Sequence, residues 1–208
     1  MLIQKLFDHF DSYTNLHIDV NDVRDQLLSM GVQDEIKFHF VKMDSGKIRG
    51  LLNRHVKHSV PYSQPTFCSD IIISGEMADE NEVWSRLVAV KELIHITDCE
   101  KLNAESEEAV NNLFQQFSLP PELRDSGKDG EIKESFLNDR VRIYCALAIL
   151  VPKSCREALR PFYPNRLSDR EIAEIAKIPV RYVPTVLDES FEDLISTFLA
   201  WELAAQPK

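Results

Sequence analysis

The sequence is poor in cysteine, and its cysteines are far apart. It has four in 208 residues and no Cys-x-x-Cys pair. A disulfide-stapled secreted domain and a zinc ribbon both need closely spaced cysteines, so neither class fits. We expect reduced thiols in a cytoplasmic protein. The cysteines are Cys68, Cys99, Cys145 and Cys155.

The sequence also lacks a long apolar run. Acidic residues interrupt the first eleven positions, where a signal peptide would keep its apolar stretch. No segment approaches the roughly 20 apolar residues that a membrane-spanning helix needs. We therefore expect no membrane partner.

Basic residues are in the minority. Lys and Arg number 24 against 34 Asp and Glu, which gives a formal net charge of −10. A general electrostatic affinity for nucleic acid is therefore not expected, although an acidic chain can still carry a local basic patch. The length and a hydrophobic content of 44% suffice for one large domain or two small ones.

Apolar periodicity predicts a mostly helical α+β fold with a small antiparallel sheet. Alternation over 36–43, turn residues at 44–46 and a second run over 47–52 predict a β-hairpin. Residues 53–66 are expected to form a polar loop in which His55 and His58 are solvated rather than metal ligands. A short strand is predicted over 71–73, and helical spacing predicts helices over 3–10, 23–30, 79–99, 110–117 and 136–151.

The last part of the chain predicts a small helical region, residues 161–208, packed on a first domain of residues 1–160. Ser168 and Glu171 have the spacing of a capping box, and a tight link at 177–179 gives a helix-turn-helix outline. DNA binding would need basic groups on the second helix, where only Arg181 stands. A packing motif is therefore favoured over a DNA-binding one.

The candidate site lies in residues 87–96, a mostly apolar stretch that a helix would bury on nearly every side. Its ionisable residues are Lys91, Glu92 and His95. Buried charges are costly unless they pair, hydrogen-bond or bind a cation, so each needs a partner.

The spacing of these residues approximates the zinc-peptidase motif His-Glu-x-x-His. In that motif two histidines hold the metal and the glutamate polarises the attacking water. Here the letters are Lys91-Glu92-Leu93-Ile94-His95. The base and the second ligand are present, but the first ligand is a lysine, and a charged ammonium has no lone pair for a metal. Such a short match also occurs on helices that carry only a Lys-Glu-His cluster satisfied by carboxylates.

A second motif strengthens the comparison. Residues 139–152 read Asp-Arg-Val-Arg-Ile-Tyr-Cys-Ala-Leu-Ala-Ile-Leu-Val-Pro. With the degenerate motif at residues 91–95 and the helical tail at 168–187, this order resembles the ImmA/IrrE family of metallopeptidases. The resemblance covers residues 36–190. It implies a zincin-like fold, a zinc site, cleavage of a regulatory protein such as a helix-turn-helix repressor, and a bacterial or phage setting.

The resemblance also shows where the chain departs from the family. Lys91 replaces a ligand, and Asp139 stands where the family has a glutamate as the third ligand. Cys99 lies four residues after His95, on the same helical face, and a thiolate is a good zinc ligand. One interpretation is thus an unusual zinc site of His95, Asp139 and Cys99, with Glu92 as the catalytic base.

The interpretation that we favour places the Lys91 ammonium where the metal would be, against the carboxylate of Asp139 or Glu92. Hydrolysis is then lost, no cofactor is needed, and the chain is a pseudoenzyme that binds a protein, such as a transcriptional regulator, through the former substrate cleft. The alternative is an active zinc-dependent endopeptidase. Direct DNA binding through residues 168–187 is a weaker option because the chain is acidic.

Overall fold

The computed structural model describes residues 1–43, 49–58, 65–97 and 134–205. For residues 77, 79, 80, 134–140 and 201–205 it describes the backbone alone. The fold is α+β and mostly helical, with a small three-stranded mixed sheet. No helix among the described residues is both long and apolar enough to cross a bilayer.

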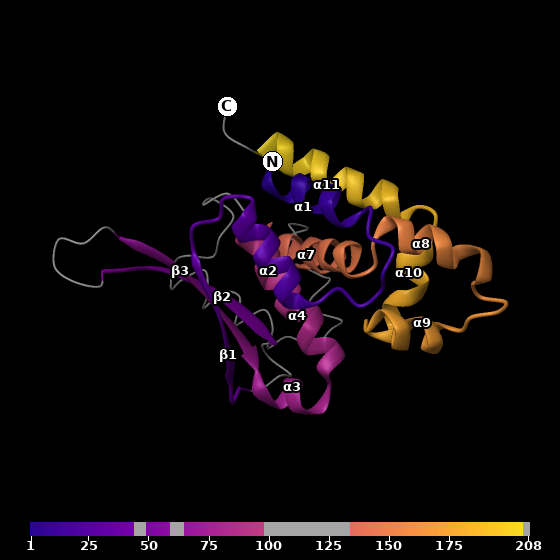
Figure 1. Ribbon diagram of the computed structural model, residues 1–208, viewed down its shortest axis with the longest axis horizontal. Coiled ribbons are helices and arrows are strands. Elements are labelled where there is room, and N and C mark those ends of the chain that lie inside the picture. The colour runs from indigo at the N-terminus through magenta and orange to yellow at the C-terminus, as the bar shows by residue number, and fades with distance from the viewer. Residues whose placement is uncertain (44–48, 59–64, 98–133, 206–208) are drawn as a thin grey trace, which may run out of the picture. The chain divides into compact units, whose positions relative to one another are not determined.

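The chain divides into two compact units (Figure 1). A helical unit holds residues 1–32 and 143–208, and a sheet unit holds residues 33–142. This division differs from the predicted boundary after residue 160, because hydrogen bonds tie the first loop to the C-terminal helices. Both Ser154 N and Ser154 Oγ donate to the Asp11 carbonyl, at 3.2 and 2.7 Å.

The sheet unit contains β1 (Glu35–Val41), β2 (Gly50–Lys57) and β3 (Thr66–Ser74), followed by α3 (Gly75–Glu80) and α4 (Glu82–His95). The strand order is β1-β3-β2. β3 pairs with β1 in parallel and with β2 in antiparallel fashion. The unit also includes the start of α7 (Glu134–Leu150), up to residue 142.

The predicted hairpin between residues 36–43 and 47–52 is wrong, because β3 lies between these two strands. β3 carries the most buried residues of the three strands, including Ile71 and Ile73 at 0% and 1% exposure. The strand with the most buried residues is most stable at the centre of a sheet, and the more exposed β1 and β2 take its edges. The sheet is therefore mixed rather than antiparallel.

The predicted loop over 53–66 is also too long. β2 continues to Lys57, so His55 is a strand residue rather than a loop residue. The predicted helix over 79–99 is two helices, α3 and α4. They are separated at Asn81, whose side chain accepts a hydrogen bond from Trp84 N and caps the second helix. The helix predicted over 110–117 lies outside the described residues.

The helical unit packs amphipathic helices around an apolar core that includes Leu6, Phe10, Leu27 and Phe191. Its elements are α1 (Leu2–Phe10), α2 (Val20–Ser29), the rest of α7, α8 (Lys153–Leu159), η2 (Arg160–Phe162), α9 (Asp169–Ala176), η3 (Val180–Tyr182), α10 (Val183–Leu187) and α11 (Phe191–Ala205).

A buried polar cluster joins the helices of this unit. Arg156 is 2% exposed and donates to the carbonyls of Ala148 and Val151. These carbonyls lie at the end of α7, where the backbone has no further helical N–H to pair with them. It also donates to Glu192 of α11 at 3.2 Å, and Arg160 pairs with the same carboxylate at 2.6 Å. Two guanidinium groups thus hold one carboxylate between α8, η2 and α11.

The helix-turn-helix outline is present as α9, η3 and α10. Ser168 and Glu171 form the predicted capping box, with Ser168 N donating to Glu171 Oε2 at 2.8 Å. Lys177 ends α9 in the left-handed region at φ 52°, which turns the chain sharply. The sequence prediction of this local structure is confirmed.

Candidate functional site

Helix α4 places the three candidate side chains in or near the core of the sheet unit. Every residue from Ser85 to Ile94 is buried, as the all-round apolar pattern predicts. Lys91 is 8% exposed and Glu92 is 3% exposed, whereas His95, in the last turn, is half-buried. Two consecutive helical residues of opposite charge are thus both withdrawn from water.

Lys91 and Glu92 form an ion pair. Lys91 Nζ lies 2.8 Å from Glu92 Oε1. Within the described part of the chain this fully buried oxygen accepts no hydrogen bond of good geometry, so the contact with the ammonium is electrostatic. Buried ions are stable only when such a charge is close, which explains why the two side chains are found together.

The carboxylate of Glu92 lies against the first residue of β2. A Cβ placed on Gly50 would be 3.1 Å from Glu92 Oε1 and much closer to Val88 Cγ1 than two carbon atoms can approach. α4 packs against β2 and β3, so only a glycine allows this close approach of strand to helix. The carboxylate of Glu92 therefore lies between α4, to which it belongs, and the backbone of β2.

Several charged side chains are buried in the described part of the sheet unit. Arg86 and Arg142 are buried at 8% and 1% exposure, in addition to Lys91. The described buried carboxylates of this unit are Glu92 and Asp34, and Asp34 already pairs with Arg54 at 3.2 Å. A metal site gathers anionic or neutral donors, whereas Lys91 brings a cation into contact with Glu92.

The predicted zinc ligands are only partly visible. His95 lies on α4, and Asp139 lies in α7 with a side chain outside the described residues. Cys99 is also outside them. Among the described side chains no group of three His, Cys, Asp or Glu residues is placed to hold an ion.

The residues that are described do not fit a zinc site of the His-Glu-x-x-His type. Of the three motif positions, Lys91 is a cation and Glu92 is in contact with it, which leaves His95 as the one donor of the motif. Zinc sites that catalyse hydrolysis keep three protein ligands. Lys91 would also repel a divalent ion at this position.

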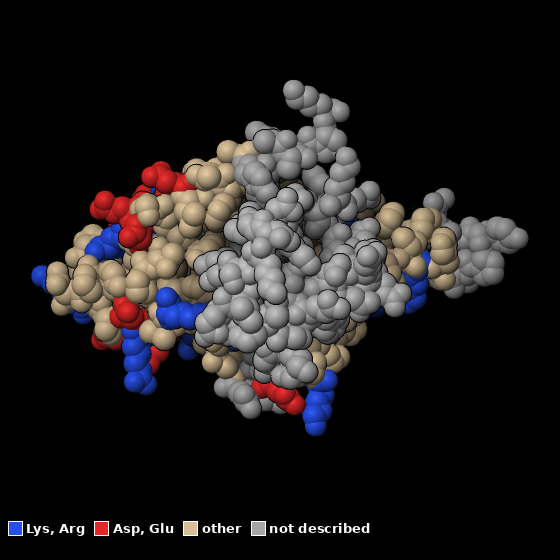
Figure 2. Space-filling model, turned by 180° about the vertical axis from the view of Figure 1, so that it is seen from behind, with Lys and Arg blue, Asp and Glu red and all other residues tan. Residues whose placement is uncertain are grey.

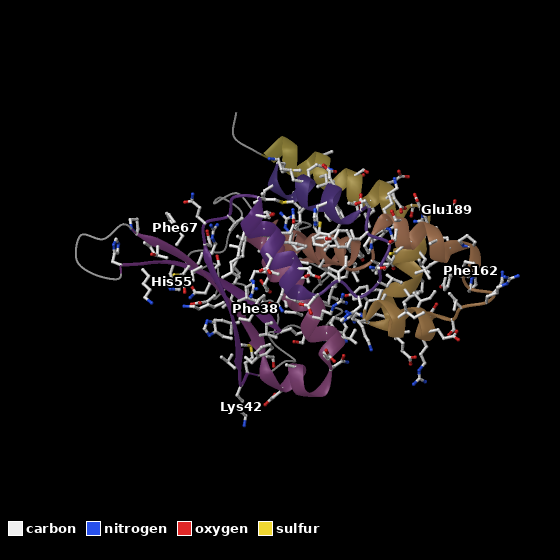
Figure 3. All side chains as sticks on the ribbon, viewed as in Figure 1. Phe38, Lys42, His55, Phe67, Phe162 and Glu189 are labelled. Atoms are coloured by element: carbon white, nitrogen blue, oxygen red, sulfur yellow. The ribbon has the colours of Figure 1, made fainter. Side chains whose placement is uncertain are left out.

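A polar cluster that the sequence did not predict crosses the outer face of the sheet. His39 Nε2 lies 2.9 Å from Asp70 Oδ1, and His55 Nδ1 lies 3.6 Å from Asp70 Oδ2. The three residues come from β1, β3 and β2, and Figure 3 labels His55 on its strand. His39 alternates with apolar neighbours in its strand, but the contact of the three residues depends on the strand order, which the sequence does not reveal.

The surface carries no broad region of one charge on the described part of the face in Figure 2, where basic and acidic side chains are interspersed. In the helix-turn-helix outline the exposed Arg181 donates to Tyr182 Oη at 2.7 Å and its guanidinium lies 4.7 Å from the tyrosine ring centroid. This arginine is thus engaged with its own neighbour.

Comparison of the chain with protein-family models, with curated proteins and with solved structures finds no match in any of the three.

Proposed function

We propose that this chain is a protein-binding regulatory module on an ImmA/IrrE-like peptidase scaffold, and that it does not hydrolyse its partner. The observation that carries the proposal is the 2.8 Å contact between Lys91 Nζ and Glu92 Oε1. In an active enzyme of this type position 91 supplies a metal ligand and Glu92 polarises a metal-bound water. Here the two charged groups are in contact with each other instead.

The ion pair also gives a structural reason for keeping Glu92 without catalysis. A carboxylate that is 3% exposed needs a cation, and Lys91 provides one without any metal. The scaffold can then stay folded while its chemistry is lost. A regulator is the partner class that the family resemblance implies, and the formal net charge of −10 favours a protein over DNA.

The first test is the metal content of protein purified without chelator. We expect far less than one zinc per chain in the wild type. Lys91→His should raise zinc affinity, because it completes His-Glu-x-x-His, whereas Lys91→Gln, the matched control, should not. Near-stoichiometric zinc in the wild type that is lost in His95→Ala would overturn the proposal in favour of the active endopeptidase.

The second test concerns the partner. A helix-turn-helix regulator encoded beside this gene should form a complex with the chain and stay intact on prolonged incubation. Glu92→Gln should still form the complex at a temperature where circular dichroism shows this less stable variant to be folded, because Glu92 has no catalytic role in this proposal. Cleavage of the regulator by the wild type and not by Glu92→Gln would show that the chain is an active peptidase.

A further inference from the structure

The edge strand β1 has an apolar stripe that α4 does not cover. Residues that pair directly across strands share a face of the sheet, so Phe38 shares its face with Ile71 and Phe40 with Ile73. Gly50 also pairs with Ile73, and it faces α4. The stripe therefore lies on the α4 side, but α4 packs mainly against β2 and β3.

The stripe becomes more exposed toward the end of the strand. Ile36 and Phe38 are half-buried, whereas Phe40 is 61% exposed, the highest value among the large hydrophobic residues whose side chains the structure describes. Figure 3 labels Phe38 within β1 and Lys42 just after its end. β1 is therefore an edge strand of the sheet formed by the described residues, where β3 is its one partner. Exposed apolar edge strands associate unless they are protected.

We propose that β1 pairs with β1 of a second copy of this chain, in antiparallel orientation about Phe38. The order Ile36, Phe38, Phe40 is symmetric about its centre. Antiparallel pairing therefore places Ile36 opposite Phe40 of the second copy and Phe38 opposite Phe38. The two apolar stripes join across a two-fold axis, and both copies use the same surface.

The opposite face of β1 is compatible with this pairing. Glu35 falls opposite Val41 of the second copy, and Lys37 falls opposite His39. Lys37 already pairs with Glu35 at 2.8 Å, and His39 with Asp70 at 2.9 Å. No two carboxylates and no two permanent cations face each other, which would be unfavourable.

The other edge strand does not offer the same match. Pairing of β2 with a second β2 about residue 54 would place Arg54 opposite Arg54, and pairing about residue 53 would place Leu52 opposite Arg54. Arg54 also points to Asp34 of its own unit. Neither of these two registers joins apolar residues as the pairing of β1 does, which favours β1 as the strand that meets a second copy.

The first experiment measures the association of two copies of the chain by sedimentation velocity, over protein concentrations from about one to several hundred micromolar. A pair of short strands is a small interface, so the dimer should be weak and concentration-dependent. Phe40→Glu should weaken it at least tenfold, because it places a carboxylate in the apolar stripe. Phe162→Glu is the matched control, since Phe162 is also an exposed phenylalanine, at 42%, in the helical unit. A wild type that stays monomeric throughout, or a Phe40→Glu variant that dimerises normally, would overturn the proposal.

The second experiment tests the register. Residues directly opposite in an antiparallel pair have Cα atoms about 4.5 to 5.5 Å apart, within reach of a disulfide. Phe38→Cys should therefore form a covalent dimer on mild oxidation. Phe40→Cys should not, because its two copies would be more than about 13 Å apart along the strands. Equal cross-linking of the two variants, or cross-linking of Phe40→Cys alone, would exclude pairing about Phe38.

Discussion

Lys91 Nζ and Glu92 Oε1 lie 2.8 Å apart on consecutive residues of α4, and both side chains are at least nine-tenths buried. Neighbouring residues of a helix point about 100° apart, so the side chains of Lys91 and Glu92 must bend toward each other to make this contact. A metal ligand and a catalytic base would instead point at a common ion. The pair thus connects the departure from the peptidase motif to the stability of the fold.

The two single substitutions of this pair should destabilise the protein more than the double substitution does. Lys91→Met removes the cation in contact with buried Glu92, and Glu92→Gln removes the carboxylate charge in contact with buried Lys91. We expect each to cost about 3 to 5 kcal/mol. The double variant should cost clearly less than the sum, because no buried charge is left over. Urea unfolding of the four proteins measures the coupling. Additive effects would show that the contact contributes nothing.

Gly50→Ala should destabilise the sheet unit by about 1 to 3 kcal/mol, because its methyl group would overlap Val88 Cγ1. The double variant Gly50→Ala/Val88→Ala should recover part of that loss, since it removes the overlapping methyl groups. Val88→Ala alone is the control for the cavity that this change leaves. Chemical denaturation followed by circular dichroism compares them, and a harmless Gly50→Ala would contradict the close approach of β2 to α4.

Arg156→Met should destabilise the protein more than Arg160→Met. Arg156 is 2% exposed and donates to two carbonyls and to Glu192, so its loss leaves buried acceptors unsatisfied and should cost about 3 to 5 kcal/mol. Arg160 has a side chain 22% exposed, and we expect about 1 to 2 kcal/mol. Thermal and urea unfolding provide the comparison. Equal effects would mean that burial does not decide the energy of this cluster.

The same cluster should make stability depend on pH in the acidic range. Burial raises the pKa of Glu192, but the hydrogen bond from Arg160 and the charge of Arg156 outweigh it, and the pKa is lowered from its ordinary value of 4.5. A carboxyl with a lower pKa in the folded state stabilises the fold above its unfolded pKa and loses that contribution as the pH falls through the folded pKa. The unfolding free energy should therefore fall as the pH drops below about 4.5. In Glu192→Gln this slope should be smaller, and an unchanged slope would contradict the assignment.

Ser168→Ala should destabilise the helical unit by about 1 kcal/mol, because it removes the side chain that caps α9. Glu174→Ala is a suitable control. It removes only an exposed i,i+4 pair with Arg170, which is worth a few tenths of a kcal/mol. Urea unfolding separates the two values, and a Ser168→Ala variant no weaker than Glu174→Ala would show that the capping box contributes little.

The sequence by itself determined the features of this protein that depend on residues a few positions apart. The all-round apolar stretch of α4 predicted its burial, and the spacing of Ser168 and Glu171 predicted the capping box. The need for a cation beside buried Glu92 also followed from the sequence, because a buried carboxylate is costly wherever the chain places it. These features arise within a few turns of helix.

Only the tertiary structure decided which distant segments meet. It placed β3 between β1 and β2, brought Asp70 between His39 and His55, and tied the N-terminal helices to the C-terminal ones through Ser154 and Asp11. Each of these pairings joins residues far apart in the sequence. Their free energy depends on the burial that all the strands and helices achieve together, so no local pattern of residues could have specified them.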